Sequence, residues 1–179
     1  MAEKKIFSIE AKKKEYIITF YDDSQIVILF EDYLKYDLAD DKEIEETIIE
    51  EIRNNYLQKK GYDTALKLLS IKRLSETEIK NKLYLREYPE NVIDEIINKL
   101  KEYNFINDES LIESVIRLMM EQEHAGFLKI KKKLIERGLS SKIIEVKLNE
   151  LYTEEYEEEA IQELISKKIK TYSDKLPEI

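Results

Sequence analysis

The segment from residue 75 to residue 151 repeats itself at an interval of 51 residues, and this periodicity limits the folds open to the chain. A shift of 51 residues makes like side chains coincide in pairs: Ile79 with Ile130, Lys82 with Lys133, Leu83 with Leu134, Ile93 with Ile144 and Leu100 with Leu151. Each copy has the apolar spacing of a helix, a short helix and a further helix. Such a unit buries little apolar area alone, whereas stacked units share faces. The repeat therefore predicts a mainly α protein, with tandem three-helix, helix-turn-helix-like units in an extended curved array.

Capping residues mark the ends of the predicted helices. Signals for helix starts are the capping box Ser75-x-x-Glu78, Pro89, Asn107-Asp108 and Ser140-Ser141. Asn104 and Gly138 suit the left-handed residue that commonly follows a helix. We expect the helix that begins near Asn107 to stop near Gly126. With only three Gly and two Pro in 179 residues, few other breaks are expected.

The first third of the chain has a different pattern. Residues 15–21 and 25–30 are rich in β-branched and aromatic side chains, and the short polar segment 22–24 separates them, which predicts a β-hairpin. Residues 5–9 are expected to add a third strand. Residues 40–51 carry isoleucines at helical spacing among many acids, which predicts an amphipathic helix with a solvated acidic face.

These patterns predict four segments. They are an N-terminal β-hairpin with the acidic helix (1–60), a first three-helix repeat (61–106), a second (107–152) and a partial third repeat (153–179). In the last segment, a group of apolar residues resembles the first helix of a repeat: Ala160, Ile161, Leu164 and Ile165.

The composition argues against an enzyme. The chain has no cysteine and one histidine, so thiol nucleophiles, cysteine-ligated metals and most histidine-dependent triads are excluded. Its glycines are too dispersed for a phosphate-binding loop. We interpret His124 as an exposed histidine at a helix end. No catalytic residue, cofactor or metal is expected.

Two further patterns concern the location of the protein. The first residues lack the apolar region of a signal peptide, and no apolar run approaches the ~18 residues that a membrane helix needs. We therefore expect a soluble, cytoplasmic protein without a membrane partner.

Acidic clusters at 43–51 and 154–159 are interpreted as solvated helix faces. We interpret Tyr16 and Tyr21 as packing residues rather than stacking platforms for bases.

One basic segment interrupts an acidic chain whose formal net charge is -9. Residues 126–142 hold six basic side chains against one acidic side chain, a local net charge of +5. Leu128, Ile130, Leu134 and Ile135 are expected to form the buried stripe of a helix, with lysines on the opposite face. Either this face is merely solvated, or it contacts phosphates or an acidic protein groove.

Several motifs, taken in order, resemble those of the RecX family. The first repeat of that family is similar to Ala65-Leu66-x-Leu68-Leu69, Ser75-x-x-Glu78-Ile79-x-x-Lys82-Leu83, Val92-Ile93 to Leu100 and Phe105-Ile106-Asn107-Asp108. Its second repeat is similar to Gly126-x-x-x-Ile130-x-x-x-Leu134-x-x-x-Gly138-Leu139. The N-terminal hairpin resembles the β-rich extension of some Gram-positive-type members. The resemblance covers most of the chain, roughly Lys5 to Lys168.

The resemblance implies a regulator of recombination and DNA repair, including the SOS response. Such a protein binds the RecA recombinase or its filament on single-stranded DNA, and restrains ATP hydrolysis and strand exchange. It has no cofactor and no catalytic residues. This chain departs from the family pattern in two ways: its third repeat is reduced to about one helix, and its net charge is strongly negative. Because of that charge, we expect any DNA contact to be weak and local. We expect a monomer.

On this hypothesis the basic helix faces the filament or its DNA. The predicted contact residues are Lys129, Lys131, Lys132, Lys133 and Arg137, with Lys80, Lys82 and Arg86 as their equivalents in the first repeat. A helix-turn-helix transcription regulator is the main alternative, but lysines suit phosphates better than base edges. A helical adaptor for protein partners is the other.

Overall fold

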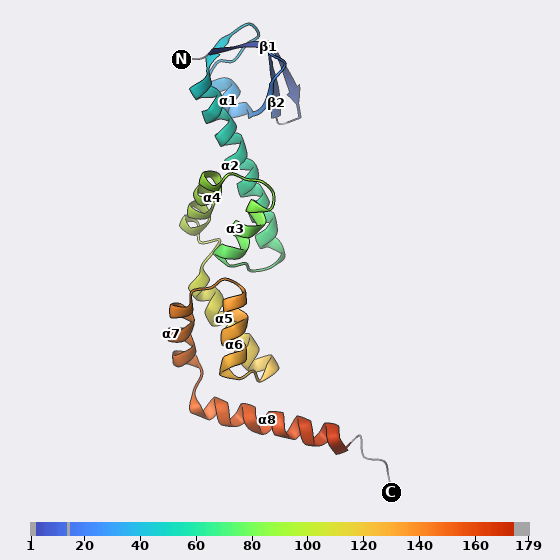
Figure 1. Ribbon diagram of the computed structural model, residues 1–179, viewed down its shortest axis with the longest axis vertical. Helices are drawn as coiled ribbons and strands as arrows, with labels where there is room; N and C mark the ends of the chain where they lie inside the picture. The colour runs from blue at the N-terminus through green and yellow to red at the C-terminus, as the bar shows by residue number, and fades with distance from the viewer. Residues whose placement is uncertain (1–2, 14, 174–179) are drawn as a thin grey trace. The chain divides into compact units, whose positions relative to one another are not determined.

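The computed structural model describes residues 3–13 and 15–173, and in this part of the chain eight helices accompany four strands (Figure 1). The strands are β1 (Glu3–Lys12), β2 (Glu15–Phe20), β3 (Gln25–Leu29) and β4 (Glu43–Glu45). The helices are α1 (Phe30–Lys35), α2 (Glu46–Ile71), α3 (Glu76–Tyr84), α4 (Glu90–Glu102), α5 (Asp108–Glu123), α6 (Phe127–Glu136), α7 (Ser141–Leu151) and α8 (Glu154–Ser173). The predicted mainly α fold with a small N-terminal sheet is confirmed.

Two compact units alternate along the sequence. One contains Met1–Lys67 and Leu83–Leu100, and the other contains Leu68–Lys82 and Lys101–Ile179. The segment boundary expected between residues 60 and 61 falls inside α2, which continues without a break to Ile71. Each unit is therefore built from two separate stretches of sequence.

The first unit contains an antiparallel sheet with the strand order β3-β2-β1-β4. Strands β2 and β3 form the predicted hairpin, in which Ile18 is the register partner of Ile26. The predicted third strand is β1, which pairs with β2 and carries an irregularity between Ile6 and Ser8. One face of the sheet packs with α2 into a buried cluster: Ile6, Ile18, Phe20, Ile26, Ile28, Leu38, Ile44, Ile49 and Ile52.

The prediction of a helix over residues 40–51 was wrong in its first part. Residues Glu43–Glu45 form β4, which pairs with Glu3–Lys5 of β1, and α2 begins only at Glu46. Ile44 is buried between two more exposed glutamates, the alternation of a half-buried strand. The open edge of β1 offers backbone hydrogen bonds to this segment, and that tertiary pairing outweighs the local helix propensity of glutamate.

The second repeat forms the core of the second unit. Helices α5, α6 and α7 enclose one buried cluster: Leu111, Ile112, Ile116, Met119, Ala125, Ile130, Leu134, Leu139, Ile144 and Leu148. At the start of α5, the side chain of Asn107 accepts a hydrogen bond from the backbone nitrogen of Ser110 (2.9 Å), as the capping prediction required. The helix ends at Glu123, slightly before the predicted stop near Gly126.

The element boundaries confirm the 51-residue repeat. Helix α3 begins at Glu76 and α6 at Phe127, and helix α4 begins at Glu90 and α7 at Ser141, so both differences (127 − 76 and 141 − 90) are 51. The helix that follows, α8, is held to the second unit near its beginning. There Ala160 is buried, and the Tyr156 hydroxyl donates to the backbone oxygen of Met120 (3.1 Å).

Candidate partner-binding surface

Helix α6 is anchored by Ile130 and Leu134, both fully buried in the core of the second unit. Successive residues of a helix are about 100° apart, so Lys132 points away from this buried face. The expectation that Leu128 and Ile135 also belong to the buried stripe was wrong, because Leu128 is 79% and Ile135 45% exposed. Each lies too far around the helix from the residues that reach the core.

The exposed side of α6 therefore mixes cations with apolar groups. We refer to Leu128, Lys129, Lys132, Lys133 and Ile135 as the α6 face. Its charge suits phosphates or carboxylates, because clustered cations gain from releasing the counterions of a polyanion. Its exposed leucine and isoleucine suit a protein surface, where burying apolar area adds to affinity. The α6 face can thus contact an acidic protein or a protein–nucleic acid complex.

Several lysines of α6 have carboxylate partners within the chain. The ion pairs are Lys129–Glu123 (2.7 Å), Lys131–Glu145 (2.6 Å) and Lys132–Glu136 (4.0 Å). Lys131 is the least exposed of these lysines, because it lies beside α7. Exposed ion pairs contribute at most about 1 kcal/mol each, so a polyanionic partner can displace the carboxylates.

Arg137, in contrast, is held inside the second unit. Its side chain is only 17% exposed, and its guanidinium donates to Glu78 Oε2 (2.7 Å) and to the backbone oxygen of Arg73 (2.8 Å). Its own backbone oxygen accepts a hydrogen bond from Ser75 Oγ (2.6 Å). Arg137 therefore joins the end of α6 to the beginning of α3, a contact that the sequence analysis missed.

The capping box that opens α3 is present as predicted. Ser75 Oγ accepts from the backbone nitrogen of Glu78 (3.0 Å), and Glu78 Oε2 accepts from the backbone nitrogen of Ser75 (2.8 Å). Burial alone would raise the pKa of Glu78, but the hydrogen bonds from Arg137 and Ser75 favour the carboxylate and lower this pKa below its ordinary value.

This lowered pKa predicts acid sensitivity. Because Glu78 is a stronger acid when folded, its contribution to stability is complete above the unfolded pKa of about 4.3. That contribution is lost as the pH falls through the lower folded value. In urea titrations between pH 6 and pH 3, the free energy of unfolding of Glu78→Gln should therefore fall less than that of the unmodified chain. The free energy of unfolding of Arg137→Gln should likewise depend less on pH. If both variants showed the same pH dependence as the unmodified chain, the ion pair between Arg137 and Glu78 would be contradicted.

The residues predicted in the first repeat occupy different settings. Lys80 pairs with Glu76 one turn earlier on α3 (3.2 Å), and Lys101 reaches the same carboxylate (2.5 Å). Lys82 is half-buried on α3, whereas Arg86 is exposed in the turn after this helix. Lys80 and Lys82 belong to the second unit and Arg86 to the first.

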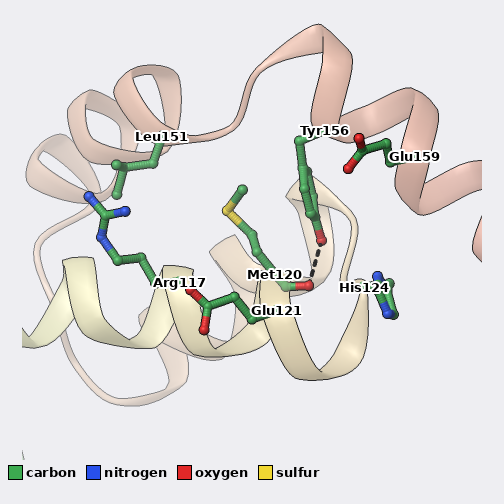
Figure 2. Close-up of a pocket in the computed structure, with 7 residues that line it drawn as sticks. All are labelled: Arg117, Met120, Glu121, His124, Leu151, Tyr156 and Glu159. Atoms are coloured by element: carbon green, nitrogen blue, oxygen red, sulfur yellow. Dashed lines mark hydrogen bonds between the residues drawn. The ribbon is translucent and has the colours of Figure 1, made fainter.

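His124 lies beside a hollow between α5 and α8 (Figure 2). It ends α5 in the left-handed conformation (φ 46°), as a helix-end residue, and is half-buried rather than fully exposed. The hollow is lined by Arg117, Met120, Glu121, His124, Leu151, Tyr156 and Glu159.

Among the described residues, no group of three or more His, Cys, Asp or Glu side chains is placed to hold a metal ion. Within the same residues, no helix has the length and apolar character needed to cross a membrane.

The repeated three-helix units and the small sheet define a modular, mainly α protein with a mixed cationic and apolar helix face. A family model described as RecX, first three-helix domain, matches residues 62–100. A crystal structure of RecX from Lactobacillus salivarius is 34% identical, with a TM-score of 0.62, over 68% of this chain and 79% of that one. The chain belongs to the RecX family.

Other comparisons agree with this assignment. A crystal structure of regulatory protein RecX has a TM-score of 0.70 and 26% identity, over 98% of this chain and 86% of that one. Curated relatives named Regulatory protein RecX include those of Lactococcus lactis subsp. cremoris (strain MG1363), 32% identical over 96% of this chain, and Streptococcus sanguinis (strain SK36), 30% identical over 97%. The chain spans 65% and 66% of the lengths of these two relatives.

Proposed function

We propose that this protein binds RecA or the RecA filament on single-stranded DNA and restrains its ATP hydrolysis and strand exchange. The observation that carries the proposal is the similarity, over nearly the whole chain, to proteins named Regulatory protein RecX. The role would be regulatory and non-catalytic, in the control of recombination and DNA repair in the cytoplasm.

The α6 face is our candidate for the main contact. Lys129, Lys132 and Lys133 would approach DNA phosphates or acidic side chains, while Leu128 and Ile135 would pack on the recombinase. Because the chain as a whole is acidic, DNA contact would be confined to this surface.

The other predicted residues would have supporting roles. Lys80, Lys82 and Arg86 would supply weaker contacts, and a filament that repeats its groove would add avidity. Lys131 would contribute to the positive potential of α6 from beside α7. Arg137 would act mainly by fixing the end of α6 through its bonds to the start of α3.

The proposal is tested by single-strand-dependent ATP hydrolysis of the cognate RecA, with this protein titrated in. Inhibition well below the RecA concentration would indicate action at filament ends or gaps. Inhibition only near equal concentrations would indicate coating of the filament. No inhibition and no filament binding by a protein with a helical circular dichroism spectrum would refute the proposed function.

Charge reversal on the α6 face should weaken inhibition. We expect Lys132→Glu/Lys133→Glu to raise the half-inhibitory concentration about tenfold or more, because two attractive charges become repulsive at the contact. The control is Lys12→Glu/Lys59→Glu, which makes the same change in net charge at exposed positions of the first unit. Equal inhibition by both folded variants would exclude the α6 face as the contact.

A further inference from the structure

The two edges of the N-terminal sheet differ in how their backbone groups are bonded. Along β1, pairing with β4 is continued by Ile6, whose backbone nitrogen donates to the backbone oxygen of Lys42 (2.9 Å). The backbone nitrogen of Ile9 donates to the Asp40 side chain (3.0 Å). The opposite edge is β3, the last strand in the order β3-β2-β1-β4. We refer to the outer side of Gln25–Leu29 as the β3 edge.

The β3 edge presents backbone groups that have no partner within the described chain. In the hairpin turn, the backbone nitrogen of Phe20 donates to the backbone oxygen of Ser24 (2.9 Å). Hydrogen-bonded pairs alternate along an antiparallel ladder, so Ile26 belongs to the next such pair with β2. The backbone groups of its neighbours Gln25 and Val27 therefore point to the β3 edge. In residues 3–13 and 15–173, no group bonds to them there.

The side chains of β3 do not protect this edge either. Exposed edges usually carry charges, proline or a bulge, because unpaired strands readily pair with other chains. Residues 25–29 contain neither a charge nor a proline, although 39% of the chain is charged. Ile26 and Ile28 are buried in the core, so the strand is fixed in place. The β3 edge is thus a firm, open template for one more strand.

The charges at the two ends of β3 indicate what kind of strand fits. Asp23 and Glu31 are exposed just before and just after it, and Lys13 lines a hollow beside Glu31 without forming an ion pair to it. Both acids are four positions from Val27, so a second copy paired antiparallel about Val27 would set Asp23 opposite Glu31 at each end. Like charges placed opposite each other destabilise strand pairs. A strand with basic ends is favoured instead.

We propose that the β3 edge binds an extended segment of a protein partner, which joins the sheet as a fifth strand. The backbone groups of Gln25 and Val27 bond to the segment, as in other complexes formed by strand addition. On the outer face of the sheet, half-buried Val27 and its register partner Ile17 contact apolar side chains at alternate positions of the segment. Basic residues at its ends face Asp23 and Glu31. The proposal does not depend on the α6 face or on RecA.

A labelled peptide tests the site on the full chain. The probe has five alternating valine and threonine residues with two lysines at each end, and fluorescence anisotropy measures its binding. We expect saturable binding, and at least tenfold weaker binding of the same peptide with glutamates in place of the lysines. Absence of binding by the lysine peptide, or equal binding of both peptides, would overturn the proposal.

Val27→Pro tests the role of the edge backbone. Proline removes an outward N–H that β2 does not use, and edge strands tolerate it at such positions. This variant should bind the lysine peptide about tenfold more weakly or worse, whereas Val27→Thr keeps the N–H and should bind like the unmodified chain. Circular dichroism and urea denaturation check that both variants fold. Unchanged binding by folded Val27→Pro would refute the proposed edge.

Amide hydrogen exchange locates the bound peptide without a substitution. In the free chain, the Val27 amide should exchange at least tenfold faster than the Ile26 amide, which bonds to β2. Saturating lysine peptide should slow exchange at Val27 tenfold or more, and unchanged exchange there would place the peptide elsewhere and overturn the proposal. A dimer of the unmodified chain that Val27→Pro abolishes in sedimentation equilibrium would assign the edge to a second copy and contradict the proposed partner.

Discussion

Leu134→Ala is expected to lower the free energy of unfolding by about 3 kcal/mol, within the 2–5 kcal/mol range of buried leucine truncations. Leu134 is fully buried in the core that α5, α6 and α7 share. Removing its outer carbons takes apolar area from that core and leaves a cavity, which both cost stability. Urea denaturation followed by circular dichroism measures the change in the free energy of unfolding. If the two units unfold in separate transitions, the change is read from the transition of the second unit.

The control for this substitution lies on the same helix. Leu128→Ala makes the same chemical change at a side chain that is largely exposed, and should alter the free energy of unfolding by about 0.5 kcal/mol or less. If the α6 face is the recombinase contact, Leu128→Ala should still weaken inhibition. Equal destabilisation by the two variants would contradict the orientation of α6.

Gly138→Ala should be the second severe substitution, with an expected loss of about 2–4 kcal/mol in the free energy of unfolding. Gly138 has φ +71°, a left-handed conformation that costs other residues about 1–2 kcal/mol. An added Cβ would also lie 2.6 Å from Thr77 Cβ and 2.5 Å from its Cγ2, so the two segments would have to move apart. The same urea titration measures this loss.

Gly126→Ala provides the matched glycine control. Gly126 begins α6 with φ -71°, and the nearest atom to an added Cβ would be the Tyr152 hydroxyl oxygen at 3.9 Å. The expected cost is about 0.5–1 kcal/mol, because alanine is a poorer residue than glycine at the position before a helix. If Gly126→Ala lowered the free energy of unfolding as much as Gly138→Ala, the left-handed conformation of Gly138 and its close approach to Thr77 would not be the cause of the loss.

Local signals explain why most of the fold was predictable. Capping residues such as Asn107 act on backbone groups within one turn, and the hairpin follows from two adjacent strands and their turn. The repeat added information over a longer range, because Ile79 and Ile130 occupy equivalent buried positions in separate helices. These features are encoded by neighbouring residues or by their recurrence.

The features that were not predicted depend on contacts between distant segments. Strand β4 exists because β1 offers it an edge, and Arg137 is withdrawn from the surface because Glu78 and Arg73 face it. The exposure of Leu128 and Ile135 depends on how far the core reaches around α6. Spacing alone gives the period of a helix and leaves the width of its buried face undetermined.

The ion pair between Arg137 and Glu78 also bears on the order in which the second unit folds during synthesis. These residues are 59 positions apart, so a ribosome that adds about 5–20 residues per second exposes Glu78 roughly 3–12 s before Arg137. During that interval, α3 of the nascent chain has its own capping box. The guanidinium and the backbone carbonyl of Arg137, which bond to Glu78 and Ser75 at the start of α3, have not yet been synthesised. The second unit therefore closes only after α6 has been synthesised, and a chain interrupted before Arg137 would leave α3 with an incompletely bonded start.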